Sequence, residues 1–310
     1  MLFYGGEPTL NFDIMRYIIE KTKKEAPVSI DISMVSNGTT LTDEMIFFLK
    51  ENSVHIGISI DGPKQVTDKN RIYYQANKSV YDAVMPNIQK LKQSGVSFGL
   101  SITITDETLN DPFFLDWIKS LGVEAINYNV MQFHDKHANW KAYIPKATRF
   151  LFESYDALQN TPTKDNRLMR KIIAFHDECF CYSDCAASGG QQFVIRPNGD
   201  VSVCHGYWNT KKEICGNVNT DSFKKMFQSP FYKNWKKTLT INRTKCLKCP
   251  AFYICGGGCP LEAEVLFGKK TQIDKPFCLY IKAVLKELLK RELLSNQADP
   301  KSPSFRDSAM

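Results

Sequence analysis

Residues 54–63 read VHIGISIDGP, an apolar run that ends abruptly at Asp61-Gly62-Pro63. The run is rich in β-branched residues and short, which is typical of a buried strand. Glycine followed by proline then breaks it. The segment therefore predicts a buried strand over Val54–Ile60 that ends in a sharp turn.

Strand and helix patterns alternate on both sides of this run. Helical spacing predicts four helices, with Thr42 as an N-cap, Gly95 as a C-cap and a kink at Pro86: Phe12–Lys24, Asp43–Glu51, Ser79–Ser94 and Pro112–Ser120. The expected strands are Leu2–Tyr4, Val28–Val35, Val54–Ile60, Val96–Thr105 and Val123–Met131. This alternation predicts an α/β fold with a parallel sheet and right-handed crossovers, either open or closed into a barrel.

Polar and glycine-rich residues follow four of these strands. They are Gly5-Gly6-Glu7-Pro8, Ser36-Asn37-Gly38, Ser59-Ile60-Asp61-Gly62 and Thr103–Asp106. In parallel sheets and barrels, ligands bind at the carboxyl ends of the strands. We therefore expect the functional residues of the first half to meet at this edge.

The second half is marked by cysteine. All ten cysteines lie between Cys179 and Cys278. The tightest pattern is Cys246-x2-Cys249-x5-Cys255-x3-Cys259, with Cys278 further on and Cys179, Cys185 and Cys204 upstream. Closely spaced thiolates converge on one metal site, so the pattern predicts iron–sulfur clusters. Structural zinc and disulfides are the alternatives, and an intracellular compartment disfavours disulfides.

The remaining segments carry weaker patterns. Pro145–Phe175 has helical spacing with a break at 161–163. Gln192–Val203 predicts a β-hairpin with Asn198-Gly199 as its turn. Tyr280–Leu294 predicts a basic amphipathic helix, and Ser295–Met310 predicts a disordered tail.

The bulk composition limits the partners. The formal charge is +7 and the pI is near 8.8, but Lys and Arg are spread along the chain, so we expect no nucleic acid. Two [4Fe–4S] clusters of about −2 each would lower the charge to roughly +3. There is no apolar run of membrane-spanning length and no signal-peptide pattern, so we expect a cytoplasmic protein without a membrane partner.

These motifs together resemble a known family. Residues 179–278 resemble the SPASM domain of radical S-adenosylmethionine (SAM) enzymes, because the cysteine pattern follows a hairpin that ends in a cysteine. The first half resembles the partial (β/α) barrel of the same enzymes, through the ordered motifs GGEP (5–8), SNGT (36–39) and ISIDGP (58–63). Anaerobic sulfatase-maturating enzymes and related peptide maturases have the most similar spacing.

The resemblance implies a domain organisation and a set of cluster ligands. The domains would be a barrel at 1–145, a helical linker at 146–178, a SPASM domain at 179–285, and a helix end with a disordered tail at 286–310. One auxiliary [4Fe–4S] cluster would be held by Cys179, Cys185, Cys204 and Cys259, and the other by Cys246, Cys249, Cys255 and Cys278. Cys181 is an alternative to Cys179, and Cys215 has no role in this scheme.

The resemblance also implies a SAM site. Gly5, Gly6, Glu7 and Pro8 would hold the amino group of SAM, with Asn37 in the next motif. Ser59 and Arg71 would contact the carboxylate or the ribose, since a guanidinium suits a carboxylate. The other interpretation of Arg71 is an ordinary solvated loop residue.

Two features depart from the family pattern. The C-x3-C-x2-C loop that holds the SAM-cleaving cluster does not occur, and the first strand before the GGEP motif is also missing. We expect that the sequence starts at an internal methionine of a longer protein or comes from a truncated gene; the alternative is that a separate chain supplies the missing part. His205 stands where sulfatase-maturating enzymes have an aspartate that accepts a proton. Histidine serves as a base near neutral pH, or it is an ordinary loop residue here. This replacement favours a peptide modification other than sulfatase maturation.

The implied function is that of a radical SAM oxidoreductase. The parent protein would form a 5′-deoxyadenosyl radical and abstract hydrogen from a side chain or Cα of a peptide or protein substrate. A flavodoxin or ferredoxin would donate electrons. The alternative for the chain itself is a non-catalytic iron–sulfur scaffold that transfers electrons or binds a peptide.

Overall fold

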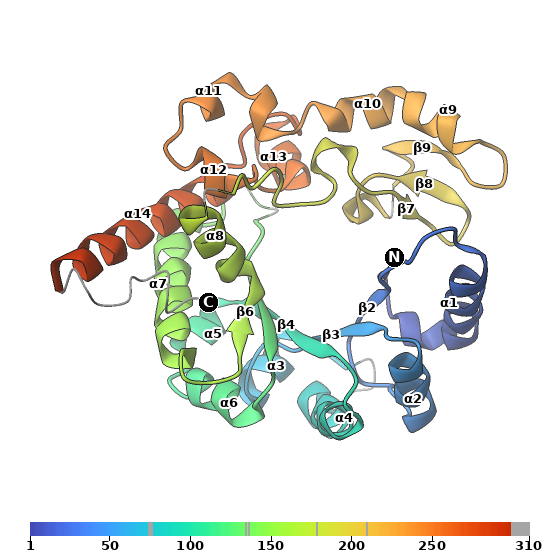
Figure 1. Ribbon diagram of the computed structural model, residues 1–310, viewed down its shortest axis with the longest axis horizontal. Helices are drawn as coiled ribbons and strands as arrows, with labels where there is room; N and C mark the ends of the chain where they lie inside the picture. Colours follow the sequence, from blue (N-terminus) through green and yellow to red (C-terminus); the bar gives the residue numbers. More distant parts are fainter. Residues whose placement is uncertain (74–76, 134, 136, 178, 209, 299–310) are drawn as a thin grey trace. The chain divides into compact units, whose positions relative to one another are not determined.

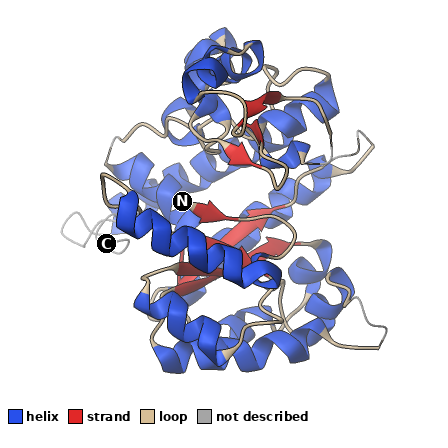
Figure 2. Cartoon of the chain, turned by 90° about the vertical axis from the view of Figure 1, so that its right-hand side faces the viewer, coloured by secondary structure: helices blue, strands red, loops and turns tan. Residues whose placement is uncertain are grey.

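The computed structural model describes residues 1–73, 77–133, 135, 137–177, 179–208 and 210–298. The chain divides into two compact units. The first comprises Met1–Met131 and Arg149–Leu168, and the second comprises Gln132–Thr148 and Met169–Met310. Helices dominate, and the strands are short (Figure 2). No helix in the described ranges is both long and apolar enough to cross a bilayer.

A six-stranded parallel sheet organises the first unit. Its strands lie in sequence order: β1 (Leu2–Phe3), β2 (Ser33–Ser36), β3 (His55–Ser59), β4 (Phe98–Ile104), β5 (Ala125–Val130) and β6 (Lys164–Asp165). Each strand pairs in parallel with the next. This confirms the predicted α/β class and the parallel sheet.

Helices connect the strands and follow one another along the outer side of the sheet (Figure 1). The main ones are α1 (Phe12–Glu25), α2 (Asp43–Glu51), α4 (Val80–Ser94) and α6 (Phe114–Leu121). Thr42 caps α2 by accepting a hydrogen bond from the Met45 N–H, and Gly95 ends α4 at φ 70°, both as predicted. Pro86 lies inside α4.

Three short helices were not predicted. They are the 3-10 helix η1 (Pro8–Asn11), α3 (Lys64–Asn70) and α5 (Asp106–Asn110). Each is too short to show the 3.6-residue period on which a sequence-based prediction depends. Each begins within five residues of the carboxyl end of a strand, so all three lie near the expected edge of the sheet.

The two faces of the sheet differ in chemistry. Ile56, Ile58 and Ile102 are fully buried on the side of the helices. The alternate residues of the same strands, including Ser59, Ser101 and Asn129, are half-buried and polar. Since side chains of a strand alternate between faces, β3 is buried on one side only, and the other side forms a polar surface.

A long helix completes the core of this unit. Residues 149–158 of α7 (Trp140–Leu158) belong to it. Phe114 is fully buried there, with its ring centroid 5.4 Å from that of Phe150 and 6.3 Å from that of Tyr128. The Tyr128 hydroxyl forms a hydrogen bond of 2.9 Å with Ser154.

The segment predicted as helical over 145–175 is two helices. Strand β6 separates α7 from α8 (Asn166–His176) near the predicted break at 161–163. Two residues of strand are too few to form a recognisable pattern. The additional strand means that the sheet has six strands, whereas the sequence predicted five.

The second unit contains an antiparallel sheet of β7 (Val194–Ile195), β8 (Asp200–Ser202) and β9 (Ile214–Asn217). Gly199 turns between β7 and β8 at φ 85°, which confirms the predicted hairpin. Strand β9 was not predicted, because its last three residues, Cys-Gly-Asn, include glycine and asparagine, which have low strand propensity. The core of this region contains Val201, Cys204, Met226 and Trp235.

Helices make up most of the rest of the second unit. They are α9 (Phe223–Gln228), α10 (Pro230–Lys236), α11 (Thr244–Leu247), α12 (Phe252–Cys255), α13 (Pro260–Phe267) and α14 (Lys275–Ala298), with short 3-10 turns η2 (Ser188–Gly190), η3 (His205–Tyr207) and η4 (Thr240–Asn242). Helix α14 is longer than the predicted 280–294. Residues 295–298, predicted to be disordered, continue this helix, and residues 299–310 of the predicted tail lie outside the described residues.

Phe114 and its neighbour Phe113 provide a matched test of the first unit. Phe114→Ala should lower the free energy of unfolding by about 3–5 kcal/mol, because it leaves a cavity among aromatic rings. Phe113 is 67% exposed, so Phe113→Ala should change it by less than about 0.5 kcal/mol. Urea denaturation followed by circular dichroism measures both, and equal effects would contradict the described core.

Candidate functional site

The Glu7 carboxylate joins the ends of β1 and β2. Its Oε1 accepts hydrogen bonds from the hydroxyls of Ser36 and Thr9, each at 2.8 Å. Its Oε2 accepts a hydrogen bond of 2.7 Å from the Asn37 N–H. The GGEP motif and the SNG motif thus meet at the carboxyl edge of the sheet, as the sequence predicted.

Space is open beside the two glycines of this motif. A Cβ built on Gly5 or Gly6 meets no heavy atom within 4 Å, and both residues are exposed. Pro8 starts helix η1, and the Glu7 carboxylate also accepts a hydrogen bond from the Thr9 N–H of this helix. The backbone of Gly5-Gly6 is therefore accessible, whereas the Glu7 carboxylate is occupied by protein donors.

Arg71 forms a two-pronged ion pair with Asp61 of the SIDGP motif. Its Nε lies 2.8 Å from Asp61 Oδ2 and its Nη2 lies 3.0 Å from Asp61 Oδ1. The Asp61 side chain is only 5% exposed, and it also accepts a hydrogen bond from the Thr103 N–H at 3.0 Å. Arg71 therefore connects β3 to its following loop, which neither interpretation from the sequence had anticipated.

Ser59 and Asn37 also lie at the carboxyl edge of the sheet. Ser59 is half-buried on the polar face and pairs in register with Ser101 of β4. Asn37 is half-buried and closes its own turn, because its Oδ1 accepts hydrogen bonds from the Thr39 N–H and hydroxyl at 2.9 and 2.7 Å. The structure thus places Gly5, Gly6, Glu7, Asn37, Ser59 and Arg71 at strand ends of one sheet.

Three thiols of the second unit form a first group: Cys185, Cys204 and Cys259. Burial raises the pKa of Cys204 to about 11, and Cys185 raises it further. Burial likewise raises the pKa of Cys259 to about 12, with contributions from Cys185 and Cys204. These three thiols thus influence one another electrostatically, and Cys185 packs against the buried cluster that contains Cys204.

Four other thiols form a second group: Cys246, Cys249, Cys255 and Cys278. Burial raises the pKa of Cys255 to about 12, and Cys278 and Cys246 raise it further. Burial also raises the pKa of Cys278, with Cys249 and Cys246 contributing. The same four cysteines are the set that the resemblance implied for one auxiliary cluster, and their assignment as ligands stays a prediction, as does that of Cys259 to the other cluster.

All ten cysteines are free thiols. Within the described residues, no three or more His, Cys, Asp or Glu side chains are placed to hold a single metal ion. Cys179 is exposed, while Cys181 is half-buried, donates its N–H to the Tyr253 carbonyl at 2.7 Å and accepts a contact from Lys171 Nζ at 3.5 Å. The choice of Cys179 or Cys181 as a ligand stays a prediction.

His205 and Cys215 lie close to Cys204 of the first thiol group but are not in the ligand scheme. His205 starts the 3-10 turn η3 after Cys204 and is exposed. Cys215 belongs to the buried core of the β7–β9 region. The catalytic role of His205 stays a prediction.

A buried lysine ties the cysteine loops together. Lys171 is 2% exposed; its Nζ lies 2.7 Å from Asp184 Oδ1 and 3.2 Å from the Cys255 carbonyl. It therefore connects the segment before Cys185 to the loop of Cys255. Lys171 lies in a helix eight residues before the first cysteine, and nothing in the sequence there predicts this contact.

Arg243 is a second cation that sequence reasoning missed. It is 8% exposed, and its Nη1 donates to the Gly257 carbonyl at 3.0 Å. Its Nε and Nη2 are buried without a hydrogen-bond partner in the described part of the chain. Burial lowers the pKa of this guanidinium, and the nearby Cys246 and Cys255 oppose that shift. Two unsatisfied donors thus lie beside thiols of the second group.

Comparisons with known proteins agree with this geometry. Residues 1–118 match the radical SAM superfamily, and residues 185–250 match the iron–sulfur cluster-binding SPASM domain. The chain carries a radical SAM domain and a SPASM domain. These domains imply SAM and [4Fe–4S] clusters as cofactors.

Two curated relatives show the range of similar enzymes. A cysteine-type anaerobic sulfatase-maturating enzyme of Clostridium novyi is 29% identical over 300 residues, which span 89% of this chain and 76% of that enzyme. The radical SAM cyclopropyl synthase TigE of Paramaledivibacter caminithermalis is 24% identical over 94% of this chain and 60% of TigE. Both of these relatives are enzymes, one a sulfatase-maturating enzyme and the other a radical SAM cyclopropyl synthase.

Solved structures share the fold. The structure of anSMEcpe with bound AdoMet superimposes with a TM-score of 0.76 at 19% identity, over 96% of this chain and 81% of that one. SuiB of Streptococcus suis has a TM-score of 0.60 at 15% identity, over 88% of this chain and 64% of SuiB. Both confirm the fold of the radical SAM–SPASM chain.

Lys171 and Arg170 provide a matched test of the cysteine region, because both contact Asp184. Lys171→Met should lower the free energy of unfolding by about 3–5 kcal/mol, since it leaves a largely buried carboxylate without its cation. The Arg170 side chain is 49% exposed and 3.5 Å from Asp184, so Arg170→Met should cost less than about 1 kcal/mol. Chemical denaturation measures both, and equal losses would contradict the buried pair.

Proposed function

We propose that this chain belongs to a maturase that oxidises a peptide or protein substrate by hydrogen abstraction from a side chain or Cα. The observation that carries the proposal is the separation of the thiols into two groups, in a chain whose other unit gathers the SAM motifs at one sheet edge. Two groups fit two auxiliary clusters, which a purely structural metal site would not need.

The residues of the sheet edge fit SAM. The Glu7 carboxylate is engaged by Ser36 and Asn37, so the accessible backbone carbonyls of Gly5 and Gly6 would receive the SAM ammonium. Ser59 faces the polar side of the sheet and would donate to the carboxylate or the ribose. Arg71 would contact the carboxylate or the ribose of SAM while it stays paired with Asp61, because this pair fixes its guanidinium at the same edge.

The thiol groups fit iron–sulfur clusters. Buried donors without a partner are rare in folded proteins and cost about 1–3 kcal/mol each. The Nε and Nη2 donors of Arg243, beside Cys246 and Cys255, would find acceptors in the sulfur atoms of a cluster held by the second group. Cys185, Cys204 and Cys259 would hold the other cluster together with Cys179 or Cys181.

Bound SAM and a SAM-cleaving cluster supply the radical that removes a hydrogen atom from the substrate. The residues of this chain orient SAM at the sheet edge and hold the auxiliary clusters in the second unit. His205 would accept a proton from the substrate, since imidazole is basic near neutral pH. A peptide-bound crystal form is recorded for both anSMEcpe and SuiB, which supports a peptide as the substrate class.

Iron counting tests the cluster assignment. After anaerobic reconstitution, the chain should hold about eight irons. Cys249→Ala and Cys185→Ala should each lower the count by about four, because each removes one ligand of a different cluster. Cys215→Ala is the control and should leave the count unchanged. Tightly bound zinc in place of iron, or the same loss for Cys215→Ala, would contradict the proposal.

SAM binding tests the sheet edge. Ser59→Ala should weaken SAM binding about tenfold, since a hydrogen bond to a charged group contributes about 1.5–3 kcal/mol. Ser33→Ala, at the amino end of β2, is the control and should bind SAM normally. Equilibrium dialysis with labelled SAM measures both.

The activity itself is tested with the protein translated from its whole open reading frame. That frame should encode C-x3-C-x2-C, and the protein should form 5′-deoxyadenosine and change the mass of a peptide substrate. A protein with two auxiliary clusters that binds no SAM would instead favour the electron-transfer scaffold.

A further inference from the structure

Strand β7 has an open edge. The order of the small antiparallel sheet is β7-β8-β9, so within the described residues β7 pairs with a strand on one side only. The Arg196 N–H donates to the Asp200 carbonyl at 2.9 Å, which makes these two residues a hydrogen-bonded pair of the ladder. In an antiparallel ladder the adjacent residue, Ile195, then has its N–H and carbonyl directed away from the partner strand. The edge of β7 thus offers a backbone donor and acceptor for a further strand.

Apolar side chains lie beside this edge, where α9 and α10 pack on the β7–β9 sheet (Figure 1). Ile195 is in register with Val201, which is buried in the core of this region, and Phe193 packs against the same core. The Phe193 ring centroid lies 5.8 Å from that of Phe223 and 5.0 Å from that of Phe227, both on α9. Ile195 is 56% exposed, Phe223 50% and Phe227 46%. A strand added along β7 would therefore cover apolar surface that is now in water.

The same two helices carry positive charge without acids of their own. Residues 222–237 read SFKKMFQSPFYKNWKK, with five lysines and no Asp or Glu. All five lysines are exposed. Lys225 pairs with Asp221, whereas in the described part of the chain no acid pairs with Lys224 or Lys233. This segment is therefore a basic surface that is open to an acidic partner.

Two of these lysines adjoin the rings. Lys224 follows Phe223 in α9, and Lys233 follows Tyr232 in α10, whose ring centroid lies 5.4 Å from that of Phe193. Open backbone groups, apolar side chains and positive charge thus meet in one region of the second unit. We name this region the β7 edge surface, and it consists of Phe193, Ile195, Phe223, Lys224, Phe227 and Lys233.

We propose that the β7 edge surface binds an extended, acidic segment of the peptide or protein substrate, a segment that is not itself oxidised. The identity of this partner rests on the proposed function. The segment would add a strand to the sheet by bonding to the N–H and carbonyl of Ile195. Its apolar side chains would pack on Phe223 and Phe227, and its carboxylates would lie near Lys224 and Lys233.

Other occupants fit this surface less well. An anionic membrane would attract the lysines and the rings, but lipid chains cannot bond to the N–H and carbonyl of Ile195. A second copy of the chain could pair its own β7 with this edge, but the lysines of the two copies would then lie together, which costs free energy. An extended acidic peptide satisfies the edge, the rings and the charges at once.

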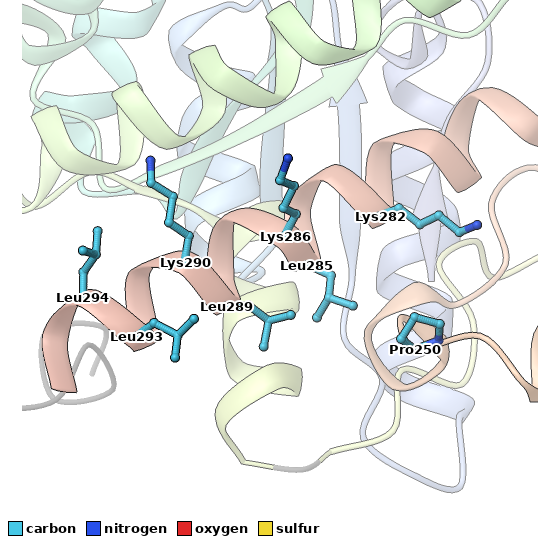
Figure 3. Close-up of a pocket in the computed structure, with 8 residues that line it drawn as sticks. All are labelled: Pro250, Lys282, Leu285, Lys286, Leu289, Lys290, Leu293 and Leu294. Carbon is cyan, nitrogen blue, oxygen red and sulfur yellow. The ribbon is translucent and has the colours of Figure 1, made fainter. Parts of the chain in front are cut away.

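Helix α14 offers a matched control, because it combines lysines and leucines without an open strand. A hollow of about 710 Å³ along this helix is lined by Pro250, three lysines and four leucines. Figure 3 shows Lys286 and Lys290 extending from one edge of the helix, with Leu285 and Leu289 on the other. The backbone groups inside a helix are bonded to one another. This face therefore has the charge of the β7 edge surface but offers no ladder to a peptide.

Fluorescence anisotropy with a labelled probe tests the strand edge. The probe is a short peptide in which glutamate alternates with valine, added to the anaerobically reconstituted chain. Ile195→Pro should weaken binding about tenfold relative to Ile195→Ala, because proline removes an N–H that only the added strand would use. Proline is tolerated where the N–H of an edge strand faces solvent. A probe that is N-methylated at every second amide should bind the unchanged protein about tenfold more weakly.

Charge reversal tests the lysines. K224E/K233E should weaken probe binding about tenfold at low salt and less at physiological salt, because these exposed charges are screened. K286E/K290E changes the net charge equally and should bind the probe as the unchanged protein does. A probe with lysine in place of glutamate should not bind. Circular dichroism should give the same spectrum for every variant, since all the substituted residues are exposed.

Three results would overturn the inference. The first is equal affinity of Ile195→Pro and Ile195→Ala for the probe. The second is an equal loss of binding from the two charge reversals. The third is that K224E/K233E loses only binding to anionic phospholipid vesicles or only dimer formation, because the partner would then be a membrane or a second copy.

The probe separates this inference from the proposed function, since its binding needs no radical chemistry. If the protein from the whole reading frame changes the mass of a substrate while Ile195→Pro binds the probe as Ile195→Ala does, only the docking surface fails. If the probe binds at β7 but that protein forms no 5′-deoxyadenosine, only the proposed oxidation fails.

Discussion

The close approach of two backbone segments determines how the cysteine region is built. The Asp184 N–H donates to the Gly256 carbonyl at 2.9 Å, and a Cβ on Gly256 would lie 2.4 Å from the Asp184 nitrogen. Gly256 also has φ 72°, which other residues rarely adopt. Only glycine therefore allows the loop of Cys255 to lie against the segment before Cys185, and Lys171 then fixes this contact from the buried side.

The acidic residues of the SAM motifs, Glu7 and Asp61, form hydrogen bonds and an ion pair within the chain. Glu7 holds β1 to β2 through Ser36 and Asn37, and Asp61 holds Arg71 and the Thr103 N–H. Each carboxylate thereby positions neighbouring groups at the sheet edge. The carboxylates of these two motifs therefore hold strand ends and their following loops together.

The sequence predicted the elements with strong local patterns. Five of the six parallel strands, the capped helix after Thr42 and the hairpin at Gly199 follow from spacing. The ligand set of Cys246, Cys249, Cys255 and Cys278 follows from the resemblance and stays a prediction. The sequence did not predict β6, β9 or the short helices after the strands. These elements are stabilised by packing and are too short to show a periodic hydrophobic pattern. The buried contacts of Lys171 and Arg243 and the Asp61–Arg71 ion pair were not predicted. The burial of a charged residue cannot be recognised from its neighbours in the sequence.

Asp274 couples the two thiol groups. It is 3% exposed; its Oδ2 accepts the Cys259 N–H at 2.9 Å, and its backbone carbonyl accepts the Cys278 N–H at 2.9 Å. One buried residue thus orients a cysteine of each group. Because Cys259 and Cys278 are both hydrogen-bonded to this residue, a substitution that moves Asp274 would displace the backbone of one cysteine in each group at the same time.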